Sequence, residues 1–187
     1  LTYTDSKFES AQKNLIGSMS KIHNYFINNM KEGKSSESIE YLKSRDLDGK
    51  DIKEFQIGFA EKDEKNTNEF FKKNNLSKTD LKNLGLLSER GNFLFKNRII
   101  FPITNLRNET VGFGGRALDD FGPKYLNTAE SSIYRKNRSL YFTSDFLSDL
   151  KKKKFVILVE GYFDVIAFNK LGFKNVASPS GTALTVQ

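Results

Sequence analysis

Two carboxylates follow a short apolar segment near the end of the sequence. Glu160 comes directly after the apolar residues 155–159, Gly161 permits a tight turn, and Asp164 follows four residues after Glu160. Ligands of parallel α/β sheets bind at the carboxyl ends of the strands, where both acids would face one crevice. Carboxylate oxygens are the ligands that Mg²⁺ prefers. The pattern predicts an acidic metal-binding site; the alternative is a solvated strand end at Glu160 and a helix-dipole partner at Asp164.

Three glycines stand close together in an earlier segment, residues 111–116. Glycine weakens the interior of a strand, so Gly112, Gly114 and Gly115 indicate a bulge or a close approach of another group to the backbone. That group could be a phosphate backbone or a nucleotide, for which Arg116 would supply the charge. The alternative is a bent hairpin that packs against a bulky core residue.

Basic and aromatic residues are interleaved in the next polar stretch. Lys124, Tyr125 and Asn127 lie close together, and Lys136 and Arg138 follow shortly afterwards. This combination is typical of binding to single-stranded nucleic acid, because rings stack on bases while cations follow the phosphates. A solvated basic loop is the ordinary alternative.

The composition favours a polyanionic partner and excludes several classes of site. The 187 residues carry a net charge of +7, and residues 89–141 hold nine Lys and Arg against five Asp and Glu. The absence of cysteine excludes disulfides and thiolate metal sites. The single histidine, His23, stands next to apolar residues and is expected to be structural. No apolar run approaches the roughly 20 residues that span a bilayer.

Helices are expected to dominate the first half of the chain. Apolar residues recur at steps of three and four from Phe8 to Phe26, which predicts a long amphipathic helix that ends near Gly33. Asp48 and Thr79 are expected to be N-caps of later helices. The shorter elements are expected to be helices at 37–43, 48–54, 68–75 and 79–84 and a strand at 55–60.

From Phe93 onward the period changes to that of strands. Residues 98–103 and 110–118 flank a polar turn and predict a β-hairpin. A helix at 142–150 is then followed by strand, helix and strand at 155–159, 161–171 and 175–177.

A strand, a helix and a second strand joined by short connections predict a parallel βαβ unit. We therefore expect an α+β N-terminal subdomain over residues 1–150, made of helices and a small mixed or antiparallel sheet. The first βαβ unit of an α/β subdomain would follow in residues 151–187.

In this order and spacing, these segments resemble the RNA-polymerase core of bacterial-type DNA primases, the DnaG family. Its R-G-L and F-x-I-G-F-A pattern is similar to residues 44–47 and 56–60, and its three basic motifs resemble residues 97–103, 111–116 and 123–127. Residues 159–165 resemble the opening motif of its Toprim subdomain, and residues 177–185 the turn that follows.

The resemblance implies roles for individual residues. Glu160 would be the Toprim acid, acting as general acid/base or as a metal-associated carboxylate, with Asp164 beside it. A basic ridge would meet template DNA and nucleotide phosphates through Arg98, Arg116, Lys124, Tyr125, Asn127, Lys136 and Arg138. The implied reaction is attack of a ribonucleotide 3′-hydroxyl on the α-phosphate of the next NTP, with Mg²⁺ or Mn²⁺ as cofactor. The implied function is synthesis of short RNA primers on single-stranded DNA during replication.

The sequence also departs from the family's pattern. No Asp-x-Asp follows Asp164, so the metal site would be incomplete, and the family's zinc-binding and helicase-binding domains are absent from this stretch. We therefore expect a fragment that binds single-stranded DNA weakly, with steep salt dependence, and makes no primers alone. Its expected partners are template DNA, NTPs and the RNA primer, with the replicative helicase reached through the absent domain and no membrane involved. Its expected location is the cytoplasm at the replication fork, or an organelle stroma.

Two other functions remain open at this point. One is a non-catalytic module that binds single-stranded nucleic acid and carries vestigial acids. The other is a different Toprim enzyme, a topoisomerase or nuclease, which would share Glu160. The primase-like motifs upstream of residue 155 argue against the second, and metal-dependent NTP binding would separate an enzyme from the first.

Overall fold

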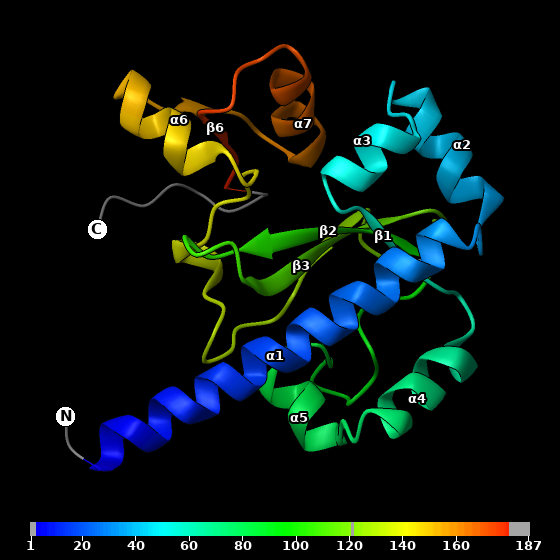
Figure 1. Ribbon diagram of the computed structural model, residues 1–187. Helices are drawn as coiled ribbons and strands as arrows, with labels where there is room; N and C mark the ends of the chain where they lie inside the picture. The colour runs from blue at the N-terminus through cyan, green and yellow to red at the C-terminus, as the bar shows by residue number, and fades with distance from the viewer. Residues whose placement is uncertain (1–2, 121, 180–187) are drawn as a thin grey trace.

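A computed structural model of the chain describes residues 3–120 and 122–179, so the resemblance noted at residues 181–185 lies outside the described part. Figure 1 shows α1 crossing one face of a central sheet, with α4 and α5 on one side and α6, α7 and β6 on the other. No helix in the described part is long and apolar enough to cross a membrane. The elements in order are α1 (Tyr3–Lys31), α2 (Ser36–Ser44), α3 (Gly49–Glu54), β1 (Gly58–Ala60), α4 (Glu64–Lys73), α5 (Lys78–Asn83), β2 (Arg98–Thr104), β3 (Thr110–Ala117), β4 (Tyr125–Asn127), the 3₁₀-helix η1 (Lys136–Arg138), α6 (Phe146–Lys153), β5 (Ile157–Leu158), α7 (Tyr162–Lys170) and β6 (Val176–Ala177).

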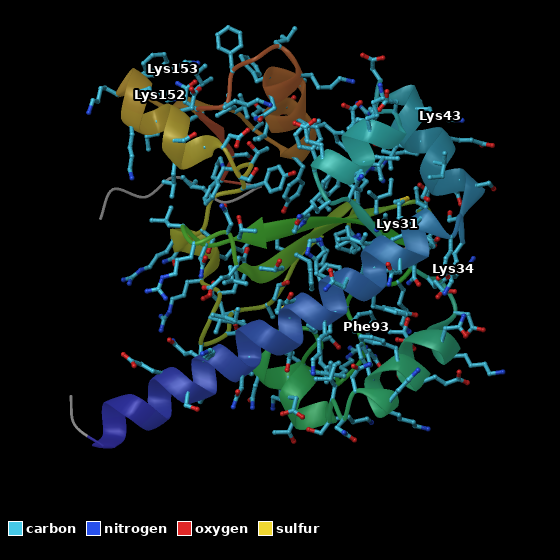
Figure 2. All side chains as sticks on the ribbon, viewed as in Figure 1. Lys31, Lys34, Lys43, Phe93, Lys152 and Lys153 are labelled. Atoms are coloured by element: carbon cyan, nitrogen blue, oxygen red, sulfur yellow. The ribbon has the colours of Figure 1, made fainter. Side chains whose placement is uncertain are left out.

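The long helix predicted from apolar periodicity is confirmed as α1, which is longer than the pattern at both ends. Met19, Ile22 and Phe26 are fully buried on one face, as the three- and four-residue spacing requires. Phe26 contacts Phe113 of β3 edge-on, with 5.3 Å between ring centroids. Figure 2 shows Phe93 beside α1, and its ring lies 6.4 Å from that of Phe26. Helix α1 therefore supports one face of the sheet.

Two short helices begin at reciprocal capping boxes. The Asp48 carboxylate accepts from the Asp51 N–H while the Asp51 carboxylate accepts from the Asp48 N–H, which confirms Asp48 as the N-cap of α3. The cap predicted at Thr79 is wrong, because Ser77 caps α5 and exchanges hydrogen bonds with Asp80. Ser77 has the carboxylate three residues later that completes the box, and Thr79 has none.

Four antiparallel strands form the main sheet, in the order β1-β2-β3-β4. The predicted hairpin is confirmed as β2 and β3. Strand β1 is shorter than predicted, because Phe55 ends α3 and Gln56 has a positive φ of 52°. Phe93 forms only an isolated bridge with Leu87. The predicted α+β fold class of the first part is confirmed.

The second sheet is the predicted parallel βαβ unit. Strand β5 pairs in parallel with β6, and α7 connects them. Helix α6 begins four residues later than the predicted start at residue 142, because Tyr141 is bridged to Ser178 beside β6. Phe101 of β2 and Ile57 share one buried cluster with Tyr162, Val165 and Val176. The βαβ unit and the antiparallel sheet are therefore joined by a common core.

Side chains of the protein itself occupy the space above the β3 glycines. A Cβ at Gly112 would meet the Tyr134 ring at 3.1 Å, and one at Gly115 would meet Phe95 at 2.7 Å. A Cβ at Gly114 would overlap the hydroxyl of Tyr162. These contacts support the packing alternative for the three glycines, and the approach of a nucleotide to them stays an untested prediction.

Replacing Gly114 by alanine should therefore destabilise the fold. The added methyl would displace Tyr162, and overpacking of this kind costs about 1–3 kcal/mol. Gly17 is the matched control, since it is exposed in α1 with nothing within 4 Å of its added Cβ. Gly17→Ala should stabilise by about 0.5–1 kcal/mol through helix propensity. Urea unfolding measures both, and equal effects at the two positions would contradict the packing role of Gly114.

His23 links α1 to the sheet as a buried neutral imidazole. It is 4% exposed, and its Nε2 donates to the backbone carbonyl of Gln56 at 2.9 Å. That bond leaves Nδ1 to accept from the Thr110 hydroxyl at 3.2 Å. Burial lowers the pKa of His23, and the hydrogen bond to Gln56 offsets this in part. The expected structural role of His23 is confirmed.

The lowered pKa makes folding stability pH-dependent. The unfolded chain binds a proton at His23 more readily than the folded chain, so stability is present above the unfolded pKa and falls with the pH below it. Thermal melts between about pH 7.5 and 5.5, where histidine titrates, should show a falling melting temperature. His23→Gln cannot titrate and should remove this dependence. An identical pH profile in that variant would rule out His23 as the cause.

Candidate functional site

The two carboxylates lie where strand β5 turns into helix α7. Glu160 is exposed, and its backbone carbonyl accepts from the Ser178 hydroxyl at 2.7 Å, which ties it to the end of β6. Asp164 Oδ2 accepts from the Gly161 N–H at 3.0 Å and so caps α7. Asp164 thus makes the helix-start contact of the structural alternative while its side chain stays exposed.

A pocket of about 340 Å³ brings these acids together with residues of the N-terminal part. One side consists of the β5–α7 turn, and the other is formed by the end of α2 and by β4. The mixture of carboxylates, a guanidinium and aromatic rings can bind a polyanion beside a cation. The pocket is lined by Arg45, Tyr125, Glu160, Gly161, Tyr162, Phe163 and Asp164.

Arg116 lies beside this pocket between two tyrosine rings. Its Cζ is 4.8 Å from the ring centroid of Tyr41 and 5.5 Å from that of Tyr125. Its Nε donates to the Tyr41 hydroxyl at 3.1 Å, and Nη1 donates to the Ala117 carbonyl. These are cation–π distances, which hold a guanidinium without neutralising its charge.

Arg45 contacts the same Tyr41 ring, and neither Arg45 nor Tyr41 is predicted from the sequence to be a site residue. Its Cζ lies 5.4 Å from the Tyr41 ring and 5.5 Å from the Phe163 ring. The only signal for Arg45 was its place in the R-G-L-like segment 44–47. Tyr41 had no signal, since it lies in α2, 75 residues before Arg116.

Arg98 lies inside the fold, and its predicted contact with template DNA or nucleotide phosphates stays a prediction. It is 4% exposed, and Nη1 donates to the carbonyls of Gly115 at 3.2 Å and Pro123 at 3.0 Å. Burial lowers the pKa of Arg98, which the nearby Asp119 carboxylate partly restores. Arg98 braces the connection between β3 and β4.

The other predicted ligand residues are divided between the pocket and a separate surface. Tyr125 is 42% exposed on β4, beside the exposed Lys124. Asn127 accepts from the Tyr162 hydroxyl at 2.5 Å and so connects β4 to α7. Lys136 and Arg138 are exposed on η1 and do not line this pocket.

Two guanidiniums at the pocket, those of Arg45 and Arg116, carry charges that no ion pair in the described residues neutralises. No ion pair is formed by Arg45 or Arg116 with any carboxylate in residues 3–120 and 122–179. Burial raises the pKa of Tyr125, and the guanidiniums of Arg116 and Arg45 lower it in part. Tyr125 is thus a neutral phenol at physiological pH, suited to stacking and to donating a hydrogen bond.

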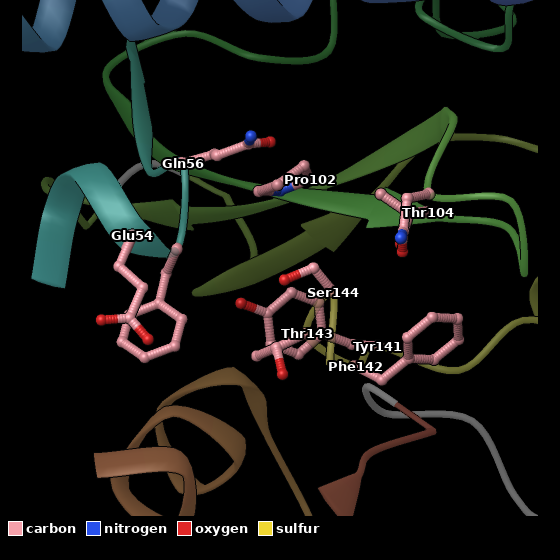
Figure 3. Close-up of a pocket in the computed structure, with 10 residues that line it drawn as sticks. Glu54, Gln56, Pro102, Thr104, Tyr141, Phe142, Thr143 and Ser144 are labelled. Atoms are coloured by element: carbon pink, nitrogen blue, oxygen red, sulfur yellow. The ribbon is translucent and has the colours of Figure 1, made fainter. Parts of the chain in front are cut away.

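A second cavity is a weaker candidate. It measures about 100 Å³ and lies between α3, β2 and residues 141–144 (Figure 3). Its polar side chains are neutral except for Glu54, and no predicted site residue lines it.

Within the part of the chain that the structure describes, no group of three or more His, Cys, Asp or Glu is placed to hold a metal. The metal site predicted at Glu160 and Asp164 therefore stays a prediction.

Comparison with known proteins identifies two families. Residues 25–146 match the N-terminal domain of the DNA primase catalytic core, and residues 154–187 match the Toprim domain. The boundary predicted after residue 150 falls between the two matches and stays a prediction.

Individual relatives cover nearly the whole chain. The DNA primase of Rickettsia bellii is 36% identical over 189 residues, which span 99% of this chain and 31% of that protein. The RNA polymerase domain of Mycobacterium tuberculosis primase DnaG superposes with a TM-score of 0.85 and 25% identity, over 93% of this chain and 58% of that one. A DnaG catalytic domain solved bound to single-stranded DNA gives a TM-score of 0.80 and 29% identity, over 93% and 56%.

The chain thus spans about a third of the length of the curated relative and somewhat over half of the solved domains. The fold as a whole agrees with that of the two solved domains. Because the primase-core match alone covers well over half of the residues, the chain belongs to the bacterial-type DNA primase (DnaG) family.

Proposed function

We propose that this chain forms the part of a DNA primase that holds template and nucleotide against the first acids of the nucleotidyl-transfer site. The observation that carries the proposal is the pocket whose walls combine Arg45 and Tyr125 with Glu160 and Asp164. The similarity to a DnaG catalytic domain bound to single-stranded DNA supports it. The full reaction would be synthesis of RNA primers from NTPs on a single-stranded template.

The basic and aromatic residues at the pocket each have a role in this proposal. Arg116 and Arg45 would neutralise phosphate oxygens, since their charges have no carboxylate partner in the described residues. Tyr125 would stack on a base, and the exposed Lys124 would follow the phosphate backbone. Cations fixed in advance by aromatic rings need little reorganisation when charge develops in the transition state.

Glu160 and Asp164 are the residues that would hold a divalent cation in this proposal. Both line the pocket, and Asp164 keeps one carboxylate oxygen beyond the one that caps α7. Mg²⁺ bound there would offset the negative charge of the phosphoryl group under attack. No Asp or Glu follows Asp164 in the sequence, so the two carboxylates would need further ligands from elsewhere.

One observation favours a narrower function for the 187 residues alone, that of a binding module. Asp164 already serves as a helix cap, and the described residues contain no third acid beside the pair. A topoisomerase or nuclease is disfavoured, because the primase-core match covers residues 25–146 upstream of the Toprim match. We further propose that the whole primase contacts a replicative helicase and acts at the replication fork in the cytoplasm.

Removing one cation beside the pocket should weaken binding to single-stranded DNA. For Arg116→Ala and Lys124→Ala we expect about three- to tenfold lower affinity for fluorescein-labelled (dT)₂₀, measured by fluorescence anisotropy. The dependence of log affinity on log salt should flatten by about 0.7 for each phosphate that is no longer neutralised. Lys72→Ala is the control, because Lys72 is exposed on α4 across the sheet from α7 (Figure 1). Equal effects of Lys72→Ala and Arg116→Ala would contradict the assigned surface.

The 187-residue chain should bind (dT)₂₀ and yet make no primers. Two carboxylates leave a divalent cation without the ligands that a nucleotidyl-transfer site requires. Incorporation of labelled NTPs on a single-stranded template with Mg²⁺ or Mn²⁺ measures this, with a relative's complete catalytic domain as the positive control. Primer synthesis by the chain alone would contradict the proposed division of the site.

A further inference from the structure

Tyr41 contacts two guanidinium groups at once. Its ring centroid lies 4.8 Å from Arg116 Cζ and 5.4 Å from Arg45 Cζ. Its hydroxyl accepts a hydrogen bond from Arg116 Nε at 3.1 Å. The two arginines come from different parts of the fold, the end of α2 and strand β3. Tyr41 is therefore the side chain that connects them.

The contacts of both arginines extend from Tyr41 to rings at the pocket. Arg116 also lies against Tyr125, at 5.5 Å, and Arg45 also lies against Phe163, at 5.5 Å. The Phe163 ring also contacts the Tyr41 ring edge-on, so the two guanidiniums and the three rings form one cluster centred on Tyr41. Tyr125, Arg45 and Phe163 line the pocket that also contains the two carboxylates.

The positive charges of Arg45 and Arg116 lie close together, and no carboxylate of the described residues neutralises them. Two cations held on one ring repel each other, and no carboxylate pairs with either arginine in residues 3–120 and 122–179. Cation–π contacts offset part of the repulsion and fix the planes of both guanidiniums. A phosphate group supplies the missing negative charge and two acceptor oxygens for planar donors.

Tyr41 also has an ordinary role as a packing residue. It is half-buried beside the core that α7 shares with the sheet, and its ring meets Phe163 edge-on at 6.0 Å. Packing alone explains a half-buried ring, but it does not require two unpaired guanidiniums on that ring or a hydroxyl aimed at Arg116. The two roles differ in what they predict for ligand binding.

We infer that Tyr41 is a positioning residue that holds Arg45 and Arg116 together at the pocket, so that the two guanidiniums bind one ligand's phosphate groups. The inference rests on the proposed function, since it assigns the phosphates to template DNA or to a nucleoside triphosphate. Tyr41 itself touches neither ligand. Its action is transmitted through the orientation of the arginines.

The test compares Tyr41→Leu with Tyr41→Phe in the 187-residue chain. Tyr41→Leu removes the ring and the hydroxyl and should weaken binding about tenfold, because the two freed arginine side chains must then be ordered when the phosphates bind. Tyr41→Phe keeps the ring and should restore most of the affinity. Fluorescence anisotropy with (dT)₂₀ and displacement of a fluorescent ATP analogue by ATP give separate measurements for the two sources of phosphate.

The salt dependence distinguishes positioning from packing. If two phosphates are no longer neutralised, the slope of log affinity against log salt should flatten by about 1.4 for single-stranded DNA. A fold that is only less stable keeps the slope, and thermal unfolding shows whether each variant is folded at the assay temperature. Tyr25→Leu is the matched control, since Tyr25 also lies under a cation, with Lys34 Nζ at 5.9 Å from its ring, but in α1.

The outcomes separate failure of the inference from failure of the proposed function. A flattened slope with (dT)₂₀, or weakened ATP binding, in Tyr41→Leu supports the inference and identifies the source of the phosphate. Tyr41→Leu added to Arg45→Ala and Arg116→Ala should cause no further loss. If Arg116→Ala weakens binding while folded Tyr41→Leu does not, Tyr41 is only a packing residue. If Arg116→Ala has no effect on either probe, the proposed function itself fails.

Discussion

The geometry of the pocket depends on how Tyr162 is held. Its ring stacks on Phe101 of β2 with 4.9 Å between centroids and an interplanar angle of 6°, and its hydroxyl donates to Asn127 at 2.5 Å. Only a glycine at position 114 leaves room for that hydroxyl above β3. Tyr162 is the first residue of α7, so these contacts fix the turn that carries Glu160 relative to β4. Tyr162 thus joins the turn that carries the acids to the strands that carry Arg116 and Tyr125.

The arginines show how surroundings decide what the same side chain does. Arg98 is buried and donates to two backbone carbonyls, so its charge serves the fold. Arg116 and Arg45 lie against aromatic rings, which hold a guanidinium in place but leave its charge available. Aromatic support costs less affinity for an incoming phosphate than a carboxylate partner would, because no ion pair must first be broken.

The sequence predicts what depends on local periodicity and misses what depends on distant packing. The long helix, the β2–β3 hairpin and the parallel βαβ unit all follow from spacing within one segment. The glycines of β3 were open to two interpretations, because the side chains that cover them come from residues 95, 134 and 162. The burial of Arg98 and the contact between Tyr41 and Arg116 likewise need the tertiary structure. Composition and motif order predict a role for the acids and for the basic residues, and they give no sign of the contacts among Tyr41, Arg45 and Arg116.

Two kinds of contact join the βαβ unit to the N-terminal part, and they differ in weight. Lys170 pairs with Asp51 at 2.8 Å and Lys174 with Glu54 at 3.4 Å. Ion pairs exposed to solvent contribute about 0–1 kcal/mol each and weaken with salt. The shared core buries Phe101, Tyr162 and further apolar residues of both parts, and burial of each such side chain contributes about 1.5–3 kcal/mol. The position of the acids relative to the arginines therefore depends on the core, which salt does not screen as it screens ion pairs.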